Sequence, residues 1–154
     1  MLERFRVVPA AYVLLRRGGD PPEVLLQLRK DTGYFDGHWA MAAAGHVEAA
    51  ESVVEAACRE AWEEIGVRID PSDLVPLTAM HRTGGDHGPL DERADFFFEC
   101  DTWQGTPRLM ESHKAAGLAW YALDALPEPV VPHERYVLEH LHRGDLGSIT
   151  TFGF

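Results

Sequence analysis

One uninterrupted helix is the feature that most constrains how this sequence can fold. Residues 51–65 contain neither glycine nor proline and are rich in good helix formers, and they are followed by Gly66, a residue typical of the position just past a helix end. At about 100° per residue, one stripe of this helix is apolar. The stripe consists of Val54, Ala57, Ala61 and Ile65. Because an apolar stripe has to be buried against another layer, the sequence predicts a helix packed on a sheet.

Strand-like segments surround this helix without a regular alternation of strand and helix. Strands are predicted at residues 7–15, 23–29, 74–81, 94–100 and 118–123, and a second helix at residues 133–143, before Gly144. Glycine and proline at residues 18–22 separate the first two strands, which predicts an opening hairpin or meander. Loops are expected at residues 32–39 and 83–89. The mixture favours an α/β (α+β) fold with a mixed sheet and helices packed on it.

Composition narrows the classes of partner. The 154 residues carry a net charge of −11, which argues against long nucleic acids and anionic membranes, since both are bound through basic patches. No apolar run approaches the roughly 20 residues of a membrane span. The length predicts a single domain over residues 1–154. Cys58 and Cys100 form no disulfide pattern, so we expect a reducing compartment, the cytoplasm.

Three carboxylates share one face of the predicted helix. The spacing of Glu60, Glu63 and Glu64 brings them within a few Å of one another, where like charges repel unless a cation lies among them. Hard oxygen ligands of this kind suit Mg²⁺ or Mn²⁺. Arg59 is expected on the far side, between Glu55 and Glu63, where it can hold a carboxylate without entering the metal site. The helix alone is also consistent with the alternative that these glutamates form a solvent-exposed face that binds no metal.

The longer segment 45–67 resembles the Nudix box. That motif reads Gly, five residues, Glu, seven residues, Arg-Glu, an aliphatic residue, any residue, Glu-Glu, any residue, Gly and an aliphatic residue. The matching residues are Gly45, Glu51, Arg59, Glu60, Glu63, Glu64, Gly66 and Val67. Ala61 departs mildly, because a bulkier aliphatic residue is usual there. A chance match has a probability on the order of one in a million.

The resemblance to the Nudix family implies a fold, a reaction and a set of site residues. It implies an α/β/α sandwich over most of the chain, and metal-dependent hydrolysis of a nucleoside diphosphate linked to another moiety. It also implies that Glu60, Glu63 and Glu64 bind the metal together with the Gly45 carbonyl, and that Glu51 and Arg59 orient these ligands. The base that takes the water's proton is either Glu60 or a glutamate outside the box.

Two further segments bear on this resemblance. Residues 103–114, followed by Trp120, resemble a segment of many small family members, and this makes Glu111 the first choice for an outside ligand or base, against a solvated loop residue. Ser112 replaces the usual proline of that segment. Residues 41–45 lack the usual Leu-Pro and are one residue longer from Trp39, which predicts an irregularity such as a bulge and bears on the Gly45 contact.

Candidate substrate contacts are aromatic or basic. Tyr34, Phe35 and Trp39 precede the box in a loop and can wall a substrate pocket, although core packing explains them equally well; Phe97 is a candidate from a strand that is otherwise core. Four basic residues near predicted strand ends are candidates for phosphate contacts, and the alternative is that they are ordinary surface charges. They are Arg29, His81, Arg82 and Arg93.

The expected function is pyrophosphohydrolysis of a nucleoside triphosphate or a related small nucleotide. The alternative is a nucleotide-sensing Nudix domain that does not hydrolyse. A zinc site is disfavoured because His140 and His142, two residues apart, point in different directions on a helix. An isomerase on the same fold would need a cysteine in a loop, which Cys58 does not supply. A homodimer is left open by the resemblance.

Overall fold

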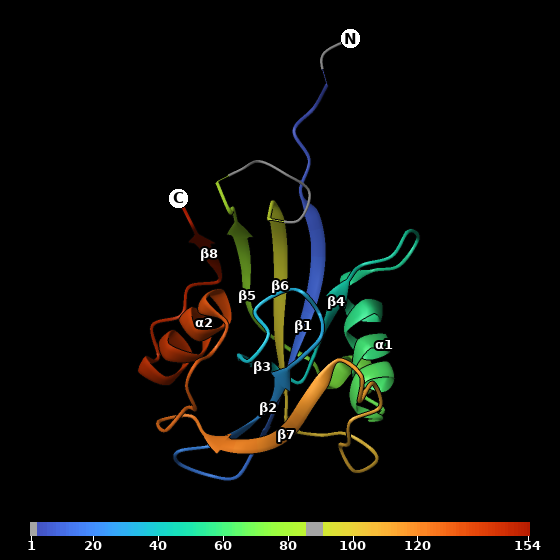
Figure 1. The fold of residues 1–154 in the computed structure, drawn as a ribbon, viewed down its shortest axis with the longest axis vertical. Helices are drawn as coiled ribbons and strands as arrows, with labels where there is room; N and C mark the ends of the chain where they lie inside the picture. Colours follow the sequence, from blue (N-terminus) through green and yellow to red (C-terminus); the bar gives the residue numbers. More distant parts are fainter. Residues whose placement is uncertain (1–2, 86–90) are drawn as a thin grey trace.

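The computed structural model describes residues 3–85 and 91–154, so residues 86–89 of the predicted loop lie outside the described part. The described residues form eight strands, β1 (Val8–Arg17), β2 (Glu23–Arg29), β3 (Trp39–Met41), β4 (Ala43–His46), β5 (Val75–Arg82), β6 (Arg93–Cys100), β7 (Ala115–Ala122) and β8 (Ile149–Phe152). Two α-helices, α1 (Val53–Ile65) and α2 (Pro132–Arg143), and a short 3₁₀ helix (Pro71–Asp73) complete the fold (Figure 1). In the described residues, neither helix has the length and apolar character needed to cross a membrane.

The sheet is mixed, as predicted. Its order is β3-β2-β1-β6-β5-β8, with β4 paired to β1 and β7 paired to β2. The β1–β6 and β5–β8 pairs are parallel and the others antiparallel. The predicted opening hairpin is confirmed by the β1–β2 pairing, in which Arg17 lies opposite Glu23.

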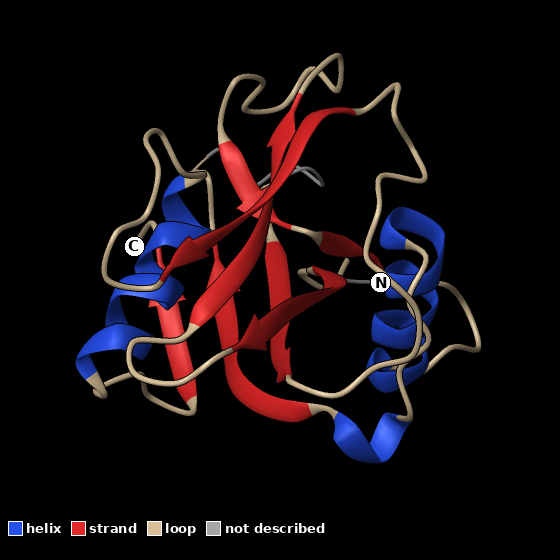
Figure 2. Ribbon diagram, turned by 90° about the horizontal axis from the view of Figure 1, so that it is seen from below, coloured by secondary structure: helices blue, strands red, loops and turns tan. Residues whose placement is uncertain are grey.

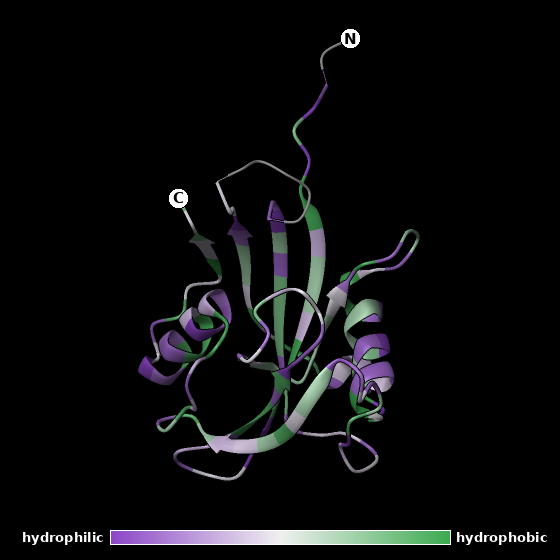
Figure 3. Ribbon diagram, viewed as in Figure 1, coloured by the Kyte–Doolittle hydropathy of each residue, from purple (hydrophilic) through white to green (hydrophobic). Residues whose placement is uncertain are grey.

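The helices cover opposite faces of this sheet, which confirms the α/β/α sandwich (Figure 2). On β1, Ala11, Val13 and Leu15 join the apolar core under α1, whereas the alternating residues join the core under α2. Those alternating residues are Ala10, Tyr12 and Leu14. Both helices carry hydrophilic and hydrophobic residues side by side, as amphipathic helices do (Figure 3).

Helix α1 matches the prediction except at its start. It begins at Val53, two residues later than expected, because Ser52 caps it: the Ser52 hydroxyl accepts from the Glu55 amide, and the Glu55 carboxylate accepts from the Ser52 amide. It ends at Gly66, whose φ of 69° is left-handed. The predicted stripe packs on the sheet, with Ala61 and Ile65 fully buried.

The expected irregularity near residues 41–45 is a change of strand partner. β3 pairs with β2, where Met41 lies opposite Leu26, and β4 pairs with β1, where Gly45 lies opposite Ala11. Between them the chain bends at the fully buried Ala42. The segment thus pairs with β2 and then with β1, and it brings Gly45 against α1.

Candidate active site

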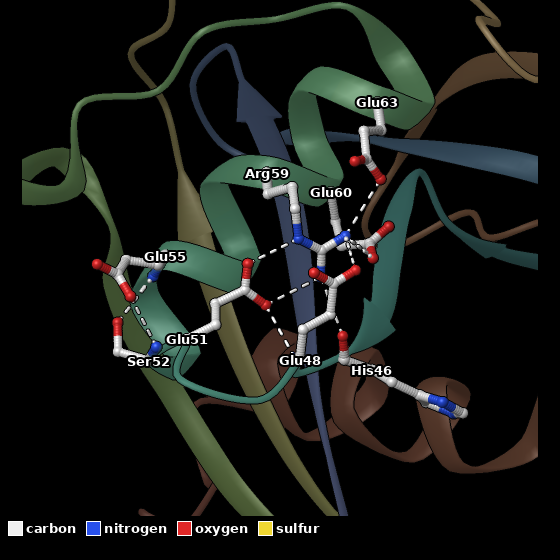
Figure 4. A network of polar contacts seen from close by, with 8 residues as sticks. All are labelled: His46, Glu48, Glu51, Ser52, Glu55, Arg59, Glu60 and Glu63. Atoms are coloured by element: carbon white, nitrogen blue, oxygen red, sulfur yellow. Dashed lines mark hydrogen bonds and ion pairs between the residues drawn. The ribbon is translucent and has the colours of Figure 1, made fainter.

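Arg59 ties α1 to the turn that precedes it (Figure 4). Its Nε and Nη2 atoms donate to the two carboxylate oxygens of Glu51, at 2.7 and 3.0 Å, in a bidentate pair. Nη2 also donates to the His46 carbonyl at 3.0 Å, and the Glu48 amide donates to Glu51 at 3.0 Å. The bonds from Arg59 lower the pKa of Glu51. Glu51 therefore stays ionised and fixes the guanidinium between β4 and α1.

The same guanidinium reaches two of the three predicted metal ligands. Nη1 of Arg59 donates to Glu60 at 2.7 Å and to Glu63 at 3.1 Å. We expected Arg59 to hold a carboxylate from the far side of the helix without entering the metal site; in the structure it holds two of the predicted ligands. The reason is the length of its side chain, which carries the guanidinium across the helix surface to either neighbour.

Glu60 and Glu64 meet beneath β4. Their carboxyl groups interact with each other, and Gln27 Nε2 donates to Glu64 at 3.2 Å. Burial raises the pKa of both carboxyl groups, and for Glu64 the neighbouring Glu60 adds to the rise. Gly45 makes room for this pair, because a Cβ at Gly45 would overlap the Glu60 carboxylate. Two predicted ligands thus form one buried acidic centre.

We expect Gly45→Ala to displace Glu60, because the added methyl group has no space. Overpacking of this kind costs about 1–3 kcal/mol of unfolding free energy. A displaced ligand is also expected to weaken Mg²⁺ or Mn²⁺ binding by about 10–100-fold. Denaturant unfolding and metal titration of the variant measure the two effects. Gly19→Ala is the control. A Cβ at Gly19 meets open space, so this variant should show neither effect, whereas the positive φ of Gly37 makes Gly37→Ala unsuitable.

Glu111 lies next to this acidic centre, where the sequence predicted it. Its charge contributes to the raised pKa of Glu64, and both residues line a pocket of about 400 Å³. The preceding loop is fixed to α1 because the Met110 amide donates to the Glu64 carbonyl at 3.0 Å. Lys114 pairs with Glu111 at 3.4 Å. The structure therefore brings a carboxylate from outside the box to within electrostatic reach of Glu64.

Glu63 is more exposed than Glu60 and Glu64, although it shares the Arg59 guanidinium with Glu60. Its side chain is 47% exposed and turned toward Arg59 (Figure 4). No three acidic, histidine or cysteine side chains within residues 3–85 and 91–154 converge closely enough to hold a metal ion. The donor set still fits a hard divalent cation, since Glu60 and Glu64 present buried carboxylate oxygens and the exposed Glu63 side chain can rotate.

A larger pocket of about 680 Å³ adjoins the acidic centre. Five of the predicted site residues line it, namely Tyr34, Phe35, Gly45, Glu64 and Arg93, together with the phosphate candidates Arg29 and Arg82. Arg93 also contacts His46, and Arg29 donates to the Tyr34 carbonyl at 2.7 Å and to the Thr32 hydroxyl at 3.0 Å. One continuous surface thus joins carboxylates, aromatic rings and arginines.

Three other candidates lie away from this pocket. Phe97 is 1% exposed and stacks on Tyr12 with 4.3 Å between ring centroids, as a core residue. Trp39 packs edge-on against Tyr121 at 5.0 Å in the same core. His81 lies against the Phe154 ring on a different surface. Strand alternation explains Phe97, because neighbouring residues of β6 face opposite cores.

The inner end of the larger pocket contains residues that sequence reasoning missed: Tyr12, His133 and Glu134. Glu134 is 4% exposed, and its Oε1 accepts from the Met41 amide at 2.8 Å. Burial raises its pKa to about 7. Burial and nearby arginines lower the pKa of His133 well below its usual value, so the ring is neutral. No sequence signal distinguishes His133 and Glu134, because polar residues that follow a proline are typical of an ordinary helix start.

Glu134 should give the stability of the protein a specific pH dependence. Its pKa is raised from 4.5 to about 7, so the folded state binds a proton that the unfolded state releases between these pH values. Stability therefore falls as the pH rises through this window, by about 3 kcal/mol for this group. We expect Glu134→Gln to gain stability relative to the wild type as the pH rises from 5 to 8 (~3 kcal/mol). Urea unfolding across this range tests it, with the partly exposed Glu139→Gln on the same helix as a control.

A mixed sheet between two helices is also the fold of MutT/Nudix proteins of known structure. A MutT NUDIX hydrolase from Burkholderia pseudomallei superposes with a TM-score of 0.76 at 27% identity, covering 87% of this chain and 97% of that one. A MutT/nudix family protein from Enterococcus faecalis superposes with a TM-score of 0.72 at 19% identity, covering 93% and 64%.

Sequence comparison agrees with the fold. The model of the NUDIX domain family matches residues 6–141, so the chain belongs to this family. The NAD-capped RNA hydrolase NudC of Chromobacterium violaceum is 30% identical in an alignment 116 residues long, which covers 66% of this chain and 42% of that protein. Putative nudix hydrolase 1 of Caenorhabditis elegans is 43% identical over 68 residues, 44% of this chain and 18% of that protein. The chain thus matches less than half the length of either relative.

Proposed function

We propose that this protein hydrolyses a nucleoside diphosphate linked to another moiety, with Mg²⁺ or Mn²⁺, and that a nucleoside triphosphate or a related small nucleotide is its substrate. The observation that carries the proposal is the buried Glu60–Glu64 pair, which borders a pocket lined by arginines. Carboxylates alone repel a polyphosphate, and arginines alone bind it without cleaving it. Side by side they suit a cation-assisted attack of water on phosphorus.

Each group has a distinct task in this reaction. Glu60, Glu63 and Glu64, with the Gly45 carbonyl, would hold the cation, which when bound neutralises phosphate charge and acidifies water. Arg59, anchored by Glu51, positions Glu60 through its 2.7 Å hydrogen bond. Arg29, Arg82 and Arg93 bind phosphate oxygens, and the exposed Tyr34 and Phe35 rings cover the remainder of the substrate.

The proton of the attacking water needs a carboxylate as its acceptor. Glu60 and Glu111 are the two candidates, one inside and one outside the box. Glu111 is partly exposed at the mouth of the smaller pocket, beside Glu64. We propose it as the base or as an additional cation ligand, because it lines the same pocket as Glu64 and its charge acts on the Glu64 carboxyl group.

The proposal extends to the cellular compartment, the class of partner and the oligomeric state of the protein. Cys58 and Cys100 are both free thiols, consistent with the reducing cytoplasm. The net charge of −11 favours small nucleotides over long nucleic acids, because a long polyanion is bound through an extended basic surface. A homodimer is compatible with the site, since every proposed contact comes from one chain.

Release of phosphate or pyrophosphate tests the function. The substrates are a panel of nucleoside triphosphates, dinucleotides, nucleotide sugars and ADP-ribose, each with Mg²⁺, with Mn²⁺ and with a chelator. We expect metal-dependent turnover of at least one class, reduced in Glu63→Gln by about 10²-fold or more. Glu139→Gln, a carboxylate removed on α2, should retain full activity. Tight nucleotide binding without turnover would favour the non-hydrolysing sensor instead, and turnover that Glu63→Gln leaves unchanged would contradict the mechanism.

A further inference from the structure

Gln27 is a polar, half-buried residue among apolar neighbours of the sheet. It lies on β2 two residues after Leu25, so strand alternation directs both side chains toward the α1 side. Leu25 belongs to the core under α1, and Leu118, opposite Gln27 on β7, packs against the same core. A carboxamide here costs desolvation that a leucine would avoid, unless its hydrogen bonds are made. Gln27 therefore requires a reason other than packing.

The hydrogen bonds of Gln27 fix the direction of its carboxamide. Its Nε2 donates to the Glu64 carboxylate at 3.2 Å and to the Met41 carbonyl at 3.4 Å. Because both partners are acceptors, the amide nitrogen is the group that faces them. Met41 is part of β3, which pairs with β2, so one bond anchors the carboxamide to the sheet and the other reaches the last turn of α1. Gln27 thus links the sheet to Glu64.

The surroundings of Glu64 are otherwise mostly repulsive. Burial raises the pKa of its carboxyl group, and the charges of Glu60 and Glu111 raise it further, whereas a backbone amide of β4 lowers it. Arg59 contacts Glu60 but makes no hydrogen bond or ion pair with Glu64 within the described residues. In the same described part of the chain, Gln27 is the side chain that donates a hydrogen bond to Glu64. Without Gln27, repulsion would turn the carboxylate away from the acidic centre.

Gln27 and Glu64 also share a place in the wall between the two pockets. Both residues line the pocket of about 680 Å³ and the pocket of about 400 Å³, together with Arg29, Thr32 and Ala44. A substrate whose two halves occupy the two pockets has its diphosphate linkage across this shared wall. The orientation of the Glu64 carboxylate at the wall therefore decides whether a cation is held beside the linkage.

We propose that Gln27 is a positioning residue, which holds the Glu64 carboxylate in the direction needed to bind a divalent cation. The inference rests on the proposed function, because that function makes Glu64 a cation ligand. Hydrogen-bond partners of metal ligands orient those ligands, and their loss typically weakens metal binding by about 10–100-fold. A neutral donor suits this task, because it fixes the carboxylate without neutralising the charge that attracts the cation. Gln27 acts on Glu64 as Arg59 acts on Glu60.

Binding of Mn²⁺ alone, measured by calorimetric titration without substrate, tests the inference apart from any hydrolysis. Gln27→Met keeps the length of the side chain and suits an apolar strand, but it removes the donor. We expect this variant to bind Mn²⁺ about 10-fold or more weakly than the wild type. Gln104→Met is the matched control, since the Gln104 side chain is exposed and borders neither pocket, and it should bind as the wild type does. Unchanged affinity in Gln27→Met would overturn the inference.

A double-mutant cycle separates positioning from a general structural effect. If Gln27 acts through Glu64, adding Gln27→Met to Glu64→Gln should change Mn²⁺ affinity by less than about threefold, because the ligand to be positioned is already gone. The same loss in both backgrounds would mean that Gln27→Met disturbs the site in another way, and would contradict the inference. Weaker binding in Glu64→Gln with none in Gln27→Met rejects the positioning role alone. Unchanged binding in both variants rejects the cation role of Glu64 as well.

Discussion

Glu64→Gln is expected to lower kcat by about 10²–10⁴-fold while the protein stays folded. Glu64 borders both pockets, contacts Glu60 and accepts from Gln27 at 3.2 Å, so it lies at the point where cation and substrate would meet. A glutamine of the same shape keeps the packing but loses the charge that attracts a divalent ion. Steady-state kinetics with saturating Mg²⁺ measure the loss, and Glu139→Gln serves as the matched control.

The same substitution should make the metal-free protein more stable. Burial and Glu60 raise the pKa of Glu64, so its ionised form is disfavoured in the folded state and stability falls as the pH rises past its ordinary range. Glutamine removes this penalty at neutral pH. Thermal unfolding should therefore give a higher Tm for Glu64→Gln without metal, and a smaller rise of Tm on adding Mg²⁺. A lower Tm without metal would mean that the carboxylate stabilises the fold.

Phe97→Ala is expected to destabilise the fold by about 3–5 kcal/mol, the usual cost of removing a buried aromatic ring. Phe97 is 1% exposed and stacks on Tyr12, which itself borders the pocket from below. Denaturant unfolding measures the loss. The milder Phe97→Leu should keep KM for the substrate unchanged, because Phe97 does not border the pocket. A raised KM in Phe97→Leu at nearly normal stability would assign Phe97 to substrate binding instead.

The sequence was sufficient for the two α-helices and the five longer strands because each of them has a strong local signal, whereas the short strands β3 and β4 were not predicted. The end of α1 at Gly66, the mixed sheet and the opening hairpin are all confirmed, and they depend on short-range patterns. The four-residue strand β8 was missed because it is defined by its pairing with β5, not by its own residues. The start of α1 shifted by two residues because a serine cap outweighs helix propensity.

From residue spacing alone, the site was predictable only where residues are close in sequence; Glu111 was named through the family resemblance. The i, i+4 spacing of Glu60 and Glu64 correctly brings them together, but spacing does not reveal that the Arg59 side chain reaches Glu60 and Glu63. Gln27 was visible as a polar residue in an apolar strand, although its contact with Glu64 is a tertiary one. Burial of Glu134 depends on how α2 meets β3, which no local pattern encodes.

The alternation of β1 side chains between two cores limits which sequence changes the chain can tolerate. Its odd-numbered residues from Ala11 to Leu15 face α1, and its even-numbered residues, with Tyr12 at the floor of the pocket, face α2. Substitutions on one side therefore leave the other layer nearly untouched. A single inserted or deleted residue would instead exchange the two sides, placing tyrosine under the acidic helix and alanine at the pocket floor. Natural variation in this strand should accordingly consist of replacements, with changes of length confined to the turn at residues 18–22.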